Sequence, residues 1–269
     1  MLLSLRPLLA GTPLYALSAL FGLIAGSFAN VCIHRLPKGQ SVVRPASRCP
    51  SCLTPIKFRD NIPVIGYLIL RGRCRACGMP ISPRYPAVEA LNGFLYFLAA
   101  QKFGGTPATL FYFLFITAMI VITFIDYDLQ IIPDEITLPG IPIGLLAGWL
   151  ILPDPFYRAA GMGITASLTG AATGFFLYYS IAFLSRGGMG GGDIKMMAMV
   201  GAVLGWKGVF LTTFLASFAG SAVGLYLMIF KGKGRKSKVP FGPFLAAGAL
   251  LSLLLGQEIV YWYIRHGQR

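Results

Sequence analysis

Long runs of apolar residues constrain the fold of this chain more than any other feature. A helix needs about 20 apolar residues to cross the hydrocarbon core of a bilayer. The runs are continuous rather than alternating in polarity, which predicts helices and not the strands of a membrane barrel. They lie at 12–32, 87–102, 107–125, 136–152, 161–185, 194–206, 208–230 and 241–263. We therefore expect an all-α polytopic membrane protein with about eight transmembrane helices.

The composition agrees with this expectation. Hydrophobic residues make up 56% of the chain and charged residues only 12%, whereas soluble domains average about 25% charged residues. A soluble globule with so few charges could not cover its surface, and a disordered chain would be less apolar. The composition thus excludes a secreted soluble enzyme, a fibrous protein and a disordered tail.

The basic residues predict the orientation in the membrane. The net charge is +14, and ten of the 23 Lys and Arg residues lie between positions 33 and 86. A further basic cluster lies at 231–238. Positively charged loops stay on the cytoplasmic side. We expect the long loop 33–86 to face the cytoplasm and the N-terminus to face outward.

Four of the five cysteines form two Cys-x-x-Cys pairs in this loop, and 21 residues separate the pairs. Two such pairs can hold one tetrahedral Zn²⁺ through four thiolates, which would leave no coordination position open for a substrate. Disulfides are a weaker alternative because the cytoplasm is reducing. We predict one structural zinc per chain, in a small cytoplasmic domain, bound by Cys49, Cys52, Cys74 and Cys77.

Two carboxylates are predicted to meet at the cytoplasmic face. Asp126 follows the third apolar run, and Asp193 follows the fifth run after Gly190, Gly191 and Gly192. Two nearby carboxylates do not both ionise easily, so the pair would hold one proton and could supply a base and an acid together. The three glycines would let a substrate backbone approach closely.

Other chemistry fits parts of this pattern. A phosphate-binding loop is disfavoured because no Gly-Lys-Ser/Thr follows the glycines. An ion-coordinating pair or a proton relay in a transporter is the main alternative, and the residues alone favour proteolysis and transport about equally.

Several motifs, in this order, resemble those of the prepilin peptidases, a family of membrane aspartic proteases. The motifs are Gly26-Ser27-Phe28-Ala29-Asn30-Val31 with Arg35-Leu36-Pro37, the two cysteine pairs with Asp60-Asn61-Ile62-Pro63 between them, Ile81 to Glu89, the Asp126 segment ending in Pro133-Asp134, and Gly190 to Asp193. The resemblance covers nearly the whole chain.

The resemblance implies that Asp126 and Asp193 form a catalytic aspartate dyad that removes the basic leader from type IV prepilins, type II secretion pseudopilins or both. It also implies methylation of the new N-terminal residue with S-adenosylmethionine, an activity associated with the cysteine domain. Asp128 and Asp134 would then support the dyad or the fold. The candidates for binding the methyl donor are Asn30, Arg35, Asp60, Asn61, Arg84, Tyr85 and Glu89.

The expected organisation has three parts: a first transmembrane helix at 1–32, the zinc-binding and methyltransferase-associated domain at 33–86, and a transmembrane aspartic peptidase domain at 87–269. The expected location is the bacterial inner membrane. The expected partners are prepilin or pseudopilin substrates and the lipid bilayer, without nucleic acid; the oligomeric state is not predicted. Alternative functions are a small transporter or channel with a regulatory zinc loop, or a peptidase that lacks methylation.

Overall fold

The computed structural model describes residues 11–156, 160–185, 189–231 and 240–267, so most of the basic cluster 231–238 lies outside the described residues. The regular elements in this part of the chain are helices with three isolated β-bridges. The helices are α1 (Thr12–Arg35), α2 (Ile65–Ile69), α3 (Arg84–Phe103), α4 (Pro107–Leu129), α5 (Asp134–Leu150), α6 (Gly163–Leu184), α7 (Gly191–Lys231) and α8 (Gly242–Gly267), and the 3-10 turns are η1 (Leu36–Lys38) and η2 (Phe58–Asp60).

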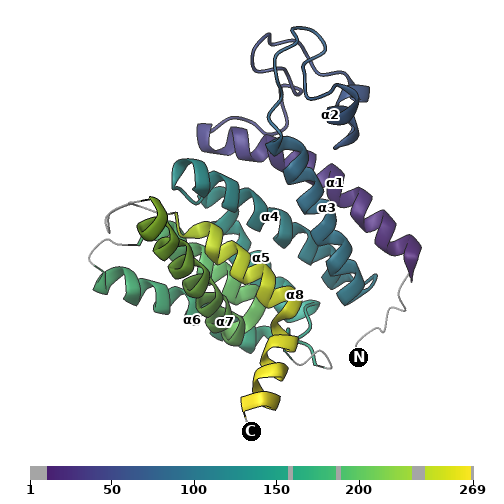
Figure 1. Cartoon of the computed structure of the whole chain (residues 1–269). Coiled ribbons are helices and arrows are strands. Elements are labelled where there is room, and N and C mark those ends of the chain that lie inside the picture. Colours follow the sequence, from purple (N-terminus) through teal and green to yellow (C-terminus); the bar gives the residue numbers. More distant parts are fainter. Residues whose placement is uncertain (1–10, 157–159, 186–188, 232–239, 268–269) are drawn as a thin grey trace. The chain divides into compact units, whose positions relative to one another are not determined.

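The chain forms two compact units, Met1–Val121 and Ile122–Arg269, and the division falls within α4. In the first unit α1 and α3 lie side by side (Figure 1). A Cβ on Gly22 would lie 2.7 Å from Gly93 Cα, so small residues allow the two helices to approach closely. The Asn92 side-chain amide donates a hydrogen bond of 2.7 Å to the Gly22 carbonyl oxygen. The loop that carries the four cysteines connects these two helices.

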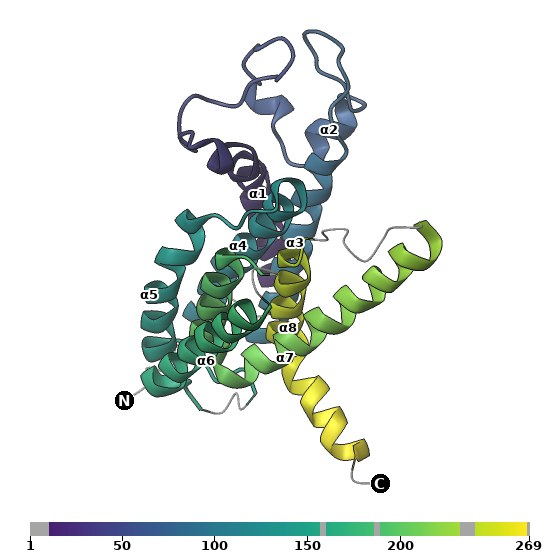
Figure 2. The ribbon, with the colours of Figure 1, turned by 90° about the vertical axis from the view of Figure 1, so that its left-hand side faces the viewer.

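The second unit is centred on α7, which packs against α5, α6 and α8. Gly170 of α6 and Gly201 of α7 face each other so closely that a side chain on either would meet the other's backbone. Ser167 Oγ donates a hydrogen bond of 2.6 Å to the Ala202 carbonyl oxygen across the same interface. The chain direction changes within α7 at Gly205, where φ is 68° and ψ is 176° (Figure 2).

Five of the described helices are long and apolar enough to cross a membrane: α1 with η1, α4, α6, α7 and α8. The predicted count of eight transmembrane helices is therefore not confirmed. The predicted run 87–102 corresponds to α3, which contains Arg84 and Glu89 as well as Lys102. The run 136–152 corresponds to α5, which has 17 residues and a length of only about 26 Å. The runs 194–206 and 208–230 both lie in α7, on either side of the break at Gly205.

Candidate active site and metal centre

Asp126 and Asp193, the two predicted dyad residues, both lie in the second unit. Asp126 is in the last turn of α4, and Asp193 is in the first turn of α7. Both residues are buried, with 6% and 9% of their surface exposed, and their charges interact electrostatically. A buried carboxylate needs a hydrogen-bond or charge partner.

Glycine backbone amides provide such partners for both acids. The Gly242 N–H donates to Asp126 Oδ2 at 3.0 Å, and the Gly190 N–H donates to Asp193 Oδ2 at 3.3 Å. A Cβ on Gly242 would lie 2.6 Å from Asp126 Oδ2, so only glycine leaves room for the carboxylate. Gly242 is absent from the sequence prediction, although its place between Phe241 and Pro243 at a helix start was a detectable signal.

The three glycines before Asp193 have different surroundings. A Cβ on Gly191 would meet no atom within 4 Å, whereas a Cβ on Gly192 would lie 2.8 Å from the Ile132 Cβ. Gly192 thus allows the start of α7 to pack against the segment between α4 and α5. Among the described residues, no atom lies within 4 Å of the position that a Gly191 Cβ would take.

An ion pair also joins these two regions. Lys195 Nζ lies 2.6 Å from both Asp134 carboxylate oxygens, which links the first turn of α7 to the first residue of α5. Asp134 is therefore engaged in a helix-to-helix contact. Asp128 is exposed, unlike Asp126 two residues before it.

The four predicted metal ligands come together in the first unit. The sulfur atoms of Cys49, Cys52, Cys74 and Cys77 all lie within 4.8 Å of one another, and Cys49 Sγ is 3.9 Å from Cys77 Sγ. A tetrahedral Zn(Cys)₄ site with Zn–S bonds near 2.3 Å has sulfur atoms about 3.8 Å apart. Four cysteines at this spacing can bind a metal ion.

The two cysteine pairs have the same backbone geometry. The Leu53 N–H donates to the Cys49 carbonyl oxygen at 2.9 Å, and the Gly78 N–H donates to the Cys74 carbonyl oxygen at 2.9 Å. Leu53 has φ 58° and Gly78 has φ 72°, so the residue directly after each pair adopts a left-handed backbone conformation. Glycine favours this conformation at position 78. Leu53 adopts it without that advantage.

The thiols of this cluster differ in pKa, and burial together with hydrogen bonds to the other cysteines raises the pKa of Cys77 to about 11. Thr54 hydrogen bonds to the Cys52 side chain and lowers the pKa of that thiol to about 6, which favours the thiolate that binds metals. Arg75, between Cys74 and Cys77, donates to both Asp60 oxygens, with Nη2 2.6 Å from Oδ1 and Nε 2.9 Å from Oδ2. The Arg75 guanidinium lowers the pKa of Asp60.

Side-chain hydrogen bonds join four of the seven candidates for binding the methyl donor to other parts of the chain: Asn30, Arg35, Asp60 and Glu89. Asn30 Nδ2 donates to the Tyr85 carbonyl oxygen at 3.1 Å, and Arg35 donates to the carbonyl oxygens of Ser41 and Pro45. Glu89 Oε2 accepts the Val64 N–H at 2.7 Å, and Asp60 pairs with Arg75. These contacts show how four of the candidates are held in the fold, and binding of the methyl donor by the seven residues stays a prediction.

Comparison with known proteins gives consistent matches along the chain. Residues 20–103 match the model of the bacterial peptidase A24 N-terminal domain, and residues 113–225 match that of the type IV leader peptidase family. Three similar proteins are each called prepilin leader peptidase/N-methyltransferase. The protein from Aeromonas hydrophila is 35% identical, and the match covers 93% of both chains. The Pseudomonas putida protein is 33% identical, covering 96% of both chains. The Bacillus subtilis protein is 34% identical, covering 91% of this chain and 96% of its own. No solved structure matches the chain.

Proposed function

Because this chain belongs to the type IV leader peptidase family, we propose that it cleaves the leader peptide from prepilins and N-methylates the residue that cleavage exposes. Prepilins, type II secretion pseudopilins or both are the proposed substrates. The observation that carries the peptidase proposal is the burial of Asp126 and Asp193 within electrostatic reach of each other.

In the proposed reaction the two carboxylates hold one proton between them. The ionised aspartate accepts a proton from a water molecule, whose oxygen attacks the scissile carbonyl carbon. The protonated partner donates a hydrogen bond to the carbonyl oxygen, which becomes an oxyanion. Collapse of this intermediate breaks the peptide bond, and the aspartate that accepted the proton from water gives it to the leaving nitrogen. The backbone amides of Gly242 and Gly190 would hold the two carboxyl groups in place during these steps.

The proposed place of the reaction is the cytoplasmic face of the bacterial inner membrane. The basic loop 33–86 would remain cytoplasmic and the N-terminus would face outward. A basic leader would then lie in the cytoplasm while the apolar part of the substrate stays in the bilayer. The sequence suggested a glycine loop, but Gly191 and Gly192 are the first residues of α7. Gly190 and this helix start would line the path of the substrate backbone. Residues 87–269 would form the peptidase domain.

The proposed metal is one structural zinc bound by Cys49, Cys52, Cys74 and Cys77, whose sulfur spacing fits a tetrahedral site. When bound, the zinc would fix the loop 33–86, which has little apolar core of its own. Cleavage would use the carboxylates alone.

The proposed methyl donor is S-adenosylmethionine, which when bound supplies a methyl group to an amine. The proposed place of methylation is the domain formed by residues 33–86. Its binding residues remain a prediction.

One experiment tests both activities. The full chain in phospholipid vesicles is incubated with a prepilin and methyl-labelled S-adenosylmethionine, and the products are analysed by mass spectrometry. We expect a shortened pilin and a free leader, with the label on the new N-terminal amine. An intact prepilin would contradict the peptidase proposal. Cleavage without label would contradict the methyltransferase proposal alone.

A further inference from the structure

An exposed apolar surface lies on the short helix α2 and the η2 turn in contact with it. Ile65, Leu68 and Ile69 occupy one side of α2, because residues three and four positions apart share a helix face, and each is more than half exposed. Phe58 of η2 is 90% exposed. We call these four side chains the α2 face.

The start of α2 is held beside a helix that can cross the membrane. Val64, directly before α2, donates its N–H to Glu89 Oε2 at 2.7 Å. Glu89 belongs to α3 and lies against α1, since a Cβ on Gly26 would be 2.7 Å from the Glu89 Cα. Gly26 lies in the last three turns of α1, which with η1 is long and apolar enough to cross a membrane. The α2 face therefore lies near the C-terminal end of α1, next to the first turns of α3 (Figures 1 and 2).

Basic side chains border this face. Lys57 and Arg59 flank Phe58, and both are exposed. Arg71, two residues after the end of α2, is exposed as well. Positions 36–83 carry eight Lys and Arg residues and a single acidic residue. Apolar side chains bordered by exposed cations complement a bilayer surface with anionic headgroups, because the apolar groups enter the acyl boundary while the cations stay at the phosphates.

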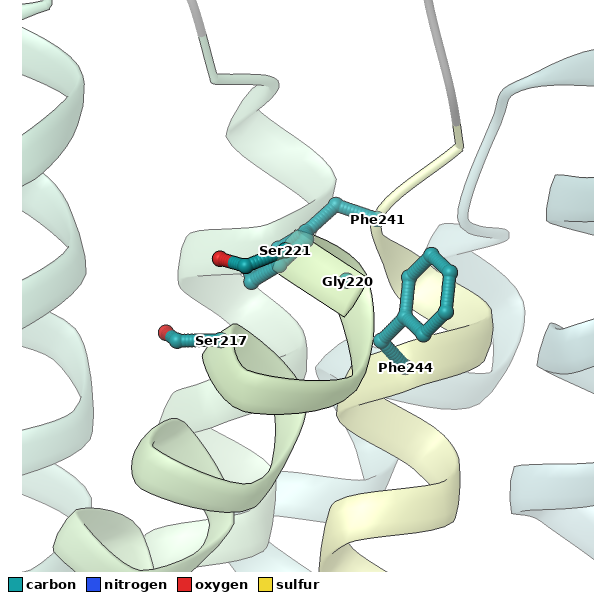
Figure 3. A pocket seen from close by; sticks show the side chains of 5 residues that line it. All are labelled: Ser217, Gly220, Ser221, Phe241 and Phe244. Carbon is teal, nitrogen blue, oxygen red and sulfur yellow. The ribbon is translucent and has the colours of Figure 1, made fainter. Parts of the chain in front are cut away.

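The pocket between α7 and α8 lacks this charge pattern. An open hollow of about 260 Å³ lies beside α7 and the start of α8 (Figure 3). It is lined by Ser217, Gly220, Ser221, Phe241 and Phe244. None of these five residues is charged. Charge complementarity to lipid headgroups therefore favours the α2 face over this hollow as a docking surface.

We propose that the α2 face is a membrane-docking surface of the four-cysteine loop. Its apolar side chains insert into the bilayer leaflet at the C-terminal end of α1, and Lys57, Arg59 and Arg71 bind the phosphates of anionic lipids. Docking holds the loop against the membrane surface, so that the loop is fixed at a third place besides its two ends. The inference does not depend on cleavage or methylation, and its test measures neither.

Tryptophan fluorescence tests the insertion. The full chain is reconstituted in vesicles of phosphatidylcholine and phosphatidylglycerol, with or without bromine on the acyl chains, and each variant is compared with the wild type and its three Trp residues. Phe58→Trp and Leu68→Trp place a probe on the α2 face. Ser51→Trp, at an exposed position in the first cysteine turn, is the matched control. We expect brominated lipid to quench the added fluorescence at positions 58 and 68 at least about twofold more than at position 51. No quenching at 58 and 68, or equal quenching at all three positions, would overturn the proposal.

Further substitutions in the Phe58→Trp chain test the two parts of the surface. Lys57→Ala combined with Arg59→Ala should reduce the quenching, and so should vesicles of phosphatidylcholine alone, because headgroup attraction is lost. Leu68→Glu should also reduce the quenching, because a carboxylate on the α2 face resists insertion. Met79→Glu is its control, since Met79 is an exposed apolar residue outside the face. Unchanged quenching in Leu68→Glu would contradict docking through the α2 face.

Other occupants of this face would give different results. A second copy of the chain would make the emission of Leu68→Trp depend on the protein-to-lipid ratio, without quenching by brominated lipid. A prepilin would shield the probe only after prepilin is added. Either result would overturn the membrane-docking proposal.

Discussion

Lys195, which follows Asp193 by two residues, has its Nζ 2.6 Å from both carboxylate oxygens of Asp134. The packing of Gly192 against Ile132 lies beside this ion pair. The segment that leads from Asp126 to α5 is thus fastened at two points to the turn of helix that carries Asp193. The spacing of the two acids therefore depends on contacts that include neither carboxylate.

Lys195→Met is expected to lower the kcat for leader cleavage about tenfold while KM stays unchanged, because small displacements of a catalytic group are costly. The Lys195 side chain is 33% exposed and that of Asp134 51%, so the loss of stability should stay below about 1 kcal/mol. Lys195→Arg should retain activity, and Asp134→Asn combined with Lys195→Met should be no worse than either alone. Lys207→Met, farther along α7, is the control. A rise in KM alone would contradict the positioning role.

Gly192→Ala and Gly191→Ala form a matched pair for the glycine loop. Gly192→Ala should lower kcat at least tenfold, because its Cβ would press on Ile132 and displace Asp193. Gly191→Ala should keep kcat and raise KM, since the open space at this glycine is where the substrate backbone would pass. Steady-state kinetics with a prepilin distinguishes the two. Equal losses of kcat in both variants would contradict this assignment.

Metal analysis of the purified chain is expected to give about one zinc per chain. Cys49→Ser should reduce this content strongly, because a buried ligand of the four-sulfur cluster is lost. Cys32→Ser is the control, since Cys32 lies in α1 outside the cluster. A chain without zinc in which all four thiols react with an alkylating agent would contradict the metal site.

Arg75→Ala should make the loop 33–86 more sensitive to proteolysis, because Arg75 holds Asp60 through two short hydrogen bonds. Arg59→Ala is the matched control, since Arg59 Nε only approaches Asp60 Oδ1 to 4.0 Å. The Asp60 side chain is 8% exposed and that of Arg75 45%, so the effect is expected to exceed that of a fully exposed ion pair. Equal sensitivity of the two variants would show that the Arg75 pair does not stabilise the loop.

Patterns within short segments, the Cys-x-x-Cys pairs and the apolar runs, predicted the features that depend on neighbouring residues alone. The proximity of the four cysteines is confirmed, because Cys-x-x-Cys spacing directs two thiols to one side of a tight turn. The apolar runs located helices, but the predicted count of eight spans is not confirmed, since five of the described helices are long and apolar enough to cross a membrane. The apolar pattern does not show that two runs belong to one element, α7, with a non-helical residue at Gly205, or that α5 has only 17 residues.

Contacts between distant residues could not be predicted in the same way. Gly242 and Asp126 are 116 positions apart, and Lys195 and Asp134 are 61 positions apart. Such pairs depend on how helices pack, and neither periodicity nor spacing encodes that packing. The dyad was predicted because the expected topology places two helix ends on one membrane face and because the motifs resemble those of the prepilin peptidases. The contact between Asp126 and Gly242 of α8 could be identified only from the structure.

Cleavage of a prepilin by Asp126→Asn, Asp193→Asn and Asp128→Asn, each folded and inserted in vesicles, tests the central claim most directly. Asn is nearly isosteric with Asp but cannot exchange a proton in this reaction. We predict that the first two variants produce no free leader, and that Asp128→Asn, with its exposed side chain two residues from Asp126, cleaves normally. Full processing by Asp126→Asn or by Asp193→Asn would contradict the aspartate dyad.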